Sequence, residues 1–181
     1  PILPLFVLMG AVASRANMAR ELFQAVNGLF AGVPGALANA TIGSCALFGA
    51  ICGSSIATAA TFSRVAIPEM RRHGYDPAFA GGAVASAGTL GVLIPPSVLI
   101  AIYAIVAEQS LVKLYAAAFI PGFLLAGLYV ISVFAVARMR PGWVPQAPAM
   151  RLAERLRSAI GMWKVGVLSV FAVFGIYLGW F

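Results

Sequence analysis

Long apolar runs separated by short charged segments dominate this sequence and predict membrane-spanning helices. The stretch 77–107 contains no charged residue, and neither does 114–137. About 20 apolar residues in a helix span a hydrocarbon core about 30 Å thick. We therefore expect 114–137 to form a plain, tilted transmembrane helix. The stretch 77–107 is longer than one upright crossing needs.

The sequence begins and ends within apolar segments. Residue 1 is Pro rather than Met, and the sequence stops inside an apolar run. We interpret 1–13 and 159–181 as truncated transmembrane helices and expect the chain to be a fragment of a longer protein. The segment 14–32 places apolar residues at helical spacing and predicts a cytoplasmic interfacial helix.

Composition supports a membrane protein, and the distribution of charge predicts its orientation. Hydrophobic residues make up 62% of the chain and charged residues 9%, against about a quarter charged in soluble domains. The net charge is +7, and most arginines lie in 64–73 and 138–157. Because basic loops stay in the cytoplasm, we expect a multi-pass membrane protein with 138–158 as a basic cytoplasmic arm. No basic stripe on a soluble face suggests a nucleic-acid partner.

The segment 33–70 is interrupted in its middle by small and polar residues, within "FGAICGSSIATAATFS". Each arm has about 16 residues, or roughly 24 Å at about 1.5 Å per residue, which is short for a crossing. Both ends of the segment adjoin basic sequence, so it must return to the side from which it enters. We predict a re-entrant helical hairpin with the Gly-Ser-Ser turn inside the membrane. The alternative is close packing of small residues between ordinary helices.

A second interruption lies within 77–107, in the sequence "SAGTLGVLIPPSV". Gly88 and Gly91 lower helix propensity, and the consecutive Pro95 and Pro96 remove two amide donors. We predict a broken transmembrane helix whose halves meet near 88–96, with the Thr89 and Ser97 hydroxyls at the break. The alternative is a simple proline kink, which membrane helices tolerate.

The two breaks together predict an ion or substrate site near the middle of the membrane. Neither break contains a carboxylate side chain, so a cation there would have neutral oxygen ligands, which suit Na⁺ better than calcium. Half-helix N-termini favour a carboxylate. Thr58 and Thr61 are expected to bond to carbonyls of their own helix. We expect no enzyme, because Ser54 and Ser55 have no base nearby; an ion channel with a broken-helix filter is the alternative function.

The motifs "GAICGSSIATAAT" and "GTLGVLIPPS" resemble the large membrane subunit of the tripartite ATP-independent periplasmic (TRAP) transporters, the dicarboxylate permease large-subunit family. The resemblance implies an all-α, elevator-type transporter repeat with a re-entrant hairpin and a broken helix. Carried over by motif position, the Na⁺ site contains Gly53, Ser54, Ser55, Gly88, Thr89 and Gly91. We expect the substrate anion near Ser55, Pro95 and Ser97. One departure is Cys52, where the family usually has Ser.

The resemblance also implies the coupling ion, the substrate class and the partners. Na⁺ would drive symport of an organic acid anion, such as a C4-dicarboxylate or a similar carboxylate. A periplasmic substrate-binding protein would deliver the organic acid substrate, and a small membrane subunit would complete the transporter. The resemblance places this multi-pass transporter in the bacterial inner (cytoplasmic) membrane, surrounded by membrane lipid.

Overall fold

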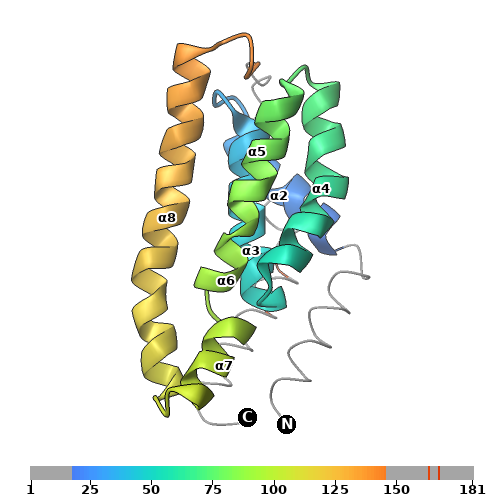
Figure 1. The fold of residues 1–181 in the computed structure, drawn as a ribbon. Coiled ribbons are helices and arrows are strands. Elements are labelled where there is room, and N and C mark those ends of the chain that lie inside the picture. Colours follow the sequence, from blue (N-terminus) through green and yellow to red (C-terminus); the bar gives the residue numbers. More distant parts are fainter. Residues whose placement is uncertain (1–17, 146–162, 164–166, 168–181) are drawn as a thin grey trace.

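The computed structural model describes residues 18–145, Trp163 and Val167, and the described part is an assembly of helices without strands (Figure 1). The helices are α2 (Met18–Phe30), α3 (Ala36–Cys52), α4 (Ser55–Arg72), α5 (Pro77–Gly88), α6 (Leu90–Leu93), α7 (Val98–Val106) and α8 (Leu111–Met139). The predicted segment 1–13 lies outside the described residues. So do most of 138–158 and 159–181.

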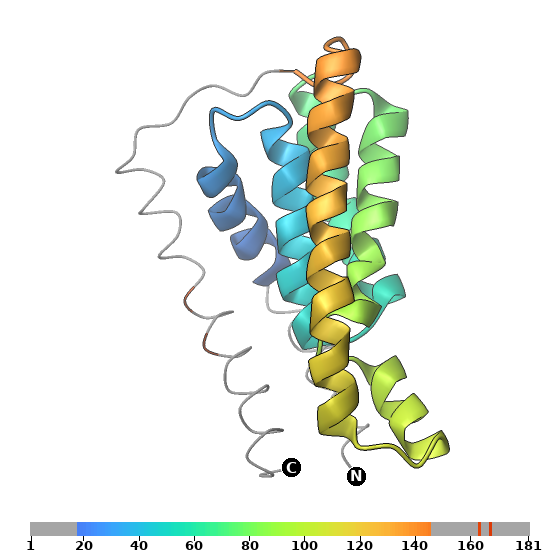
Figure 2. The same ribbon diagram turned by 90° about the vertical axis from the view of Figure 1, so that its left-hand side faces the viewer.

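The helix α3 lies at the centre of the bundle and is buried along nearly its whole length. It contacts α2, α4, α5, α6 and α8, which surround it (Figures 1 and 2). Phe48 of α3 meets Phe62 of α4 edge to face, with ring centroids 5.6 Å apart, and both rings are fully buried. The two arms of the predicted hairpin are therefore held together by a packed aromatic core.

The helix α2 is amphipathic, and its apolar face covers α3. Leu22, Phe23 and Val26 are buried, whereas Arg20 and Gln24 are exposed. A helix of this pattern can cover lipid or protein. In this structure its apolar face packs on the central helix, and its polar face points away from it.

The turn between α3 and α4 consists of Gly53 and Ser54. Gly53 has φ +62°, a left-handed conformation that favours glycine, and its N–H bonds to the carbonyl of Gly49 over 2.7 Å. In Figure 1 this turn lies well short of the level at which α7 joins α8. At about 1.5 Å per residue, the 18 residues of α4 rise roughly 27 Å and the 29 of α8 roughly 43 Å.

The broken helix is interrupted at Ile94–Ser97, a narrower region than the sequence predicted. The pair Pro77–Leu93 and Val98–Val106 bends by 41° across this break. Gly88 and Gly91 instead remain in helical segments, and Thr89 between them keeps right-handed helical angles, φ −64° and ψ −24°. A glycine lowers helix stability by only about 1 kcal/mol, whereas prolines remove the hydrogen bond itself. The prolines therefore decide where the helix breaks.

The helix α8 is long and apolar enough to span a membrane, and the bent pair of α5–α6 with α7 passes the same test as one broken span. Large apolar side chains such as Ile120, Phe123 and Leu128 are exposed along α8. An apolar outer surface of this kind is expected where a helix contacts lipid or another apolar partner. The chain is an all-α membrane protein.

Candidate ion and substrate site

The two interruptions of the chain meet in the folded protein. The N–H of Val98, the first residue of α7, donates to the carbonyl of Gly53 in the hairpin turn over 3.3 Å. A Cβ atom on Gly53 would lie 2.9 Å from the Val98 nitrogen and 3.1 Å from the carbonyl oxygen of Pro96. The hairpin turn and the proline break are thus in backbone contact, which only a glycine at position 53 permits.

The helices that leave the two breaks begin in the same way. Ser54 is the N-cap of α4 and accepts from the N–H of Ala57 at 3.4 Å, and Ser97 is the N-cap of α7 and accepts from the N–H of Ile100 at 3.5 Å. A helix N-terminus concentrates positive potential and unpaired N–H groups. Two such ends, each capped by a serine hydroxyl, therefore lie at the junction.

Ser97 is held in position from α8. Its side chain is 1% exposed, and its carbonyl accepts a 2.9 Å hydrogen bond from the hydroxyl of the buried Tyr115. This bond fixes the start of α7 against the long helix. Pro95, the other predicted substrate residue from this break, is also buried, whereas Ser55, the first residue of α4, is partly exposed.

Glycines bring the broken helix into backbone contact with the hairpin. A Cβ on Gly49 of α3 would lie 2.5 Å from the Cα of Gly91, and one on Gly88 would lie 2.7 Å from the Cβ of Ala59 in α4. Small residues let membrane helices approach this closely. Gly88 and Gly91 therefore allow the broken helix to pack closely on α4 and α3, and they do not break the helix. Gly49 was not among the predicted site residues. Its Gly-x-x-x-Gly spacing with Gly53, which is typical of close helix contacts, could have indicated it.

Thr58 differs from the prediction that its hydroxyl bonds to its own helix. The side chain is fully buried, and its Oγ1 has no hydrogen-bond partner. A Cβ on Gly91 would lie 2.9 Å from this oxygen and 3.1 Å from the carbonyl oxygen of Ser54. The Thr58 hydroxyl and the Ser54 carbonyl therefore pack directly against the backbone of Gly91, which leaves no room for a side chain at position 91. A buried hydroxyl without a partner is costly, so the Thr58 hydroxyl is the oxygen at this contact that still has the capacity to bind a ligand.

Thr89 does not join this group. Its hydroxyl donates to the carbonyl of Ser86 over 2.7 Å and lies 3.0 Å from the hydroxyl of Tyr129 on α8. The side chain is exposed and directed toward α8, whereas the adjacent Gly88 faces α4. Of the predicted ion-site residues, Gly53, Ser54 and Gly91 are brought together, with Gly88 on the same side.

The donors at the junction are neutral oxygen atoms. Across the described residues, no three His, Cys, Asp or Glu side chains lie close enough to hold a metal ion. The last turns of α3 and α6 add carbonyl groups without intrahelical partners. Carbonyl and hydroxyl oxygens are ligands for hard cations, and the paired helix N-termini complement an anion.

Comparison with known proteins connects this architecture to a transporter family. Residues 2–181 match the family described as "Tripartite ATP-independent periplasmic transporter, DctM component". The chain is 40% identical over 180 residues to the C4-dicarboxylate TRAP transporter large permease protein DctM of Pseudomonas aeruginosa, covering 99% of this chain and 42% of that protein. It is 31% identical over 179 residues to the ectoine TRAP transporter large permease protein TeaC of Halomonas elongata, covering 98% and 41%.

A third relative is matched over a smaller share of its length. The isethionate TRAP transporter permease protein DctMQ of Oleidesulfovibrio alaskensis is 36% identical over 141 residues, which cover 78% of this chain and 22% of that protein. The chain thus spans about two-fifths of the first two relatives and less of the third.

Proposed function

Because this chain belongs to the DctM family of tripartite ATP-independent periplasmic transporters, we propose that it forms part of a Na⁺-coupled permease that imports an organic acid anion. The observation that supports this best is the contact between the two breaks, the 3.3 Å hydrogen bond from Val98 to Gly53. Half-helix ends that meet inside a membrane protein form ion and substrate sites in secondary transporters.

The coupling ion binds on the hairpin side of the junction. The hydroxyl of Thr58 and the carbonyl of Ser54 both lie against Gly91, and the Thr58 hydroxyl has no protein partner. Neutral oxygen atoms compensate one positive charge better than two, which favours a monovalent cation. Na⁺ would join α4 to α6 and so stabilise the contact between hairpin and broken helix.

The anion binds near the two serine-capped N-termini. Ser54 and Ser97 start α4 and α7, and Ser55 and Pro95 flank them. N–H groups and hydroxyls at these ends can donate to a carboxylate. A relative is named for C4-dicarboxylate and another for isethionate, and both solutes have an anionic oxygen group. The proposed substrate class is therefore an organic acid anion.

Transport requires the junction to face the two sides of the membrane alternately. The hairpin α3–α4 and the broken helix α5–α7 share a packed core, to which α8 is also tied through Val133 and the bond from Tyr115 to Ser97. These helices can therefore move as one body, in an elevator motion, relative to a scaffold formed by the rest of the transporter. A periplasmic substrate-binding protein would deliver the anion, and a small membrane subunit would support the scaffold. These partners follow from the family, one relative of which is a DctMQ protein.

The test is Na⁺-dependent uptake by the complete permease, with its small subunit and binding protein, in proteoliposomes. Thr58→Val removes a proposed ligand at constant volume and should raise the Na⁺ concentration for half-maximal uptake about tenfold, as expected for one lost hydrogen-bond-like contact to a charge. Thr41→Val is the matched control, because the buried Thr41 hydroxyl already donates to Leu37 within α3. An equal Na⁺ dependence in both variants would contradict the site, and currents without the binding protein would favour a channel.

A further inference from the structure

A polar cleft runs between α2 and α4, away from the junction of the breaks. Its first part has a volume of about 420 Å³, within the range of small-molecule sites. A second part of about 320 Å³ continues along α4 and shares its lining with the first. The first part begins at Ala57, in the first turn of α4, and the second reaches Arg72 at the other end of that helix.

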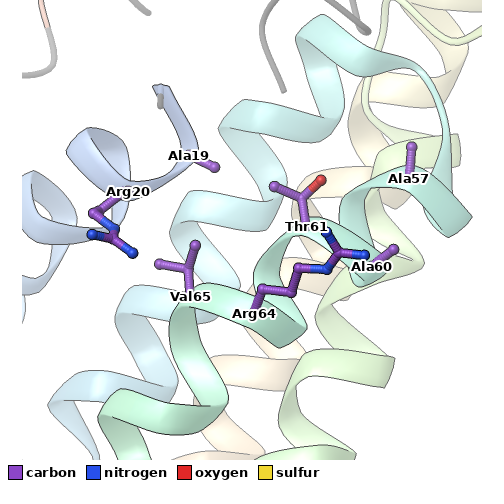
Figure 3. A pocket seen from close by; sticks show the side chains of 7 residues that line it. All are labelled: Ala19, Arg20, Ala57, Ala60, Thr61, Arg64 and Val65. Carbon is purple, nitrogen blue, oxygen red and sulfur yellow. The ribbon is translucent and has the colours of Figure 1, made fainter. Parts of the chain in front are cut away.

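Two arginines lie on the opposite walls of this cleft, Arg20 from α2 and Arg64 from α4 (Figure 3). The Arg64 side chain extends along α4 toward Ala60. No ion pair joins Arg20 or Arg64 to a carboxylate within the part of the chain that the structure describes. Glu69, the carboxylate in the second part of the cleft, lies instead 3.6 Å from Arg72 and 3.7 Å from His73.

The arrangement makes the cleft attractive for an anion. Two guanidinium groups that share a cleft repel one another unless negative charge lies between them. The floor beneath them consists of Ala57, Ala60 and Thr61, short side chains that leave the guanidinium groups accessible (Figure 3). Guanidinium groups bind carboxylate, sulfonate or phosphate oxygens through paired hydrogen bonds.

The position of Arg64 is unusual for a residue that only contacts lipid headgroups. It follows the start of α4 by nine residues and precedes Arg72 by eight, so it lies roughly 12–14 Å from either end of the helix at about 1.5 Å per residue. If α4 is one arm of the predicted re-entrant hairpin, Arg64 lies within that arm rather than in the basic loop that follows it, and arginines in such positions mark functional paths. The cleft therefore connects the start of α4 with its end, where Arg71 and Arg72 lie (the basic end).

We propose that the cleft between α2 and α4, lined by Arg20, Arg64, Ala57, Ala60, Thr61 and Val65, is an anion-binding site on the route between the junction and the basic end. Its ligand is an organic anion with carboxylate or sulfonate oxygens, bound between Arg20 and Arg64. That this anion is the transported solute rests on the proposed function. The binding of an anion between Arg20 and Arg64 does not depend on the proposed function.

The first experiment measures the charge of the cleft without transport. Ala60→Cys places a thiol on the floor of the cleft in the complete permease, where Cys45 and Cys52 are buried. Its rate of modification is compared for a sulfonate-bearing and a trimethylammonium-bearing methanethiosulfonate. One guanidinium about 8 Å away changes each rate about fivefold, in opposite directions, at an intermediate effective dielectric. The sulfonate reagent should react faster, and Arg64→Gln or Arg20→Gln should lower this preference.

Arg71→Gln is the matched control, since Arg71 is an exposed arginine of α4 that does not line the cleft. It should leave the ratio of the two rates unchanged. Ala57→Cys provides a second reporter if Ala60→Cys does not assemble. Equal rates for the two reagents, or an equal effect of all three arginine changes, would overturn the proposal.

Two further experiments identify the anion that binds in the cleft. In vesicles of phosphatidylcholine, succinate or isethionate should slow the sulfonate reagent at Ala60→Cys, and Arg64→Gln should abolish this protection. If phosphatidylglycerol in the vesicles protects and the small anions do not, the cleft holds a lipid headgroup and the proposal fails. Uptake that survives Arg64→Gln unchanged would remove the cleft from the transport route, whereas loss of Na⁺ dependence alone would affect only the proposed function.

Discussion

The contact between Gly49 and Gly91 makes a prediction that the structure allows to be quantified. Gly49→Ala would place a Cβ 2.5 Å from the Cα of Gly91 and 3.0 Å from its nitrogen. Ordinary contacts begin near 3.4 Å, so α3 and α6 must separate by about 0.9 Å. Backbone cannot rotate away as a flexible side chain can, and the whole helix must move.

The expected loss of stability follows from two opposing terms. Overpacking a tight contact costs about 1–3 kcal/mol, whereas alanine in place of glycine within a helix contributes about 0.5–1 kcal/mol of stabilisation. The net effect of Gly49→Ala is then a destabilisation of about 0–2.5 kcal/mol, and of about 1–3 kcal/mol relative to a glycine-to-alanine change that meets no clash. The displacement also separates Gly91 from the hairpin oxygens, so the stabilisation of the protein by Na⁺ should decrease.

The assay is thermal unfolding of the complete permease in detergent, in NaCl and in KCl. Gly82→Ala in α5 is the control, because a Cβ there meets nothing within 4 Å, and it should unfold at or above the temperature of the unchanged protein. Gly49→Ala should unfold at a lower temperature, with a smaller difference between the two salts. A Gly49→Ala protein as stable as the Gly82→Ala protein would refute the backbone contact between the hairpin and the broken helix.

Three other predictions concern the caps, the position of Thr89 and the hairpin turn. Ser54→Ala and Ser97→Ala each remove an N-cap and should lower the free energy of unfolding by about 1 kcal/mol, measured by chemical denaturation, and Ser→Thr at either position should restore part of it. Thr89→Val and Tyr129→Phe should show a coupling of about 0.6 kcal/mol in a double-mutant cycle, with no change in Na⁺ dependence; a Na⁺ shift in Thr89→Val alone would instead make Thr89 an ion ligand. Ile56 is 82% exposed beside the turn, and Ile56→Cys should react with membrane-impermeant reagents in a Na⁺- and substrate-dependent manner if the hairpin is re-entrant, whereas constant reaction from the outside would indicate two full crossings.

The sequence by itself determined the class of the protein and the approximate places where its helices stop. The apolar runs require a helical membrane protein because backbone groups in lipid must bond within their own segment. Pro95 and Pro96 lack amide hydrogens, and Gly53 allows the left-handed turn. These are local properties, and they appear directly in the order of residues.

The tertiary structure alone decided which groups form the junction. The sequence around Gly88 and Gly91 predicted a helix break. In the folded protein these glycines instead lie where the broken helix packs against α3 and α4. Thr89 bonds to Tyr129, 40 residues later, and Thr58 is buried without the hydrogen bond to its own helix that the sequence predicted. The partners of these side chains are distant in the sequence and depend on how the helices rotate and pack. Helical periodicity does not encode that information, because a hydroxyl or a glycine has the same local pattern whichever helix it meets.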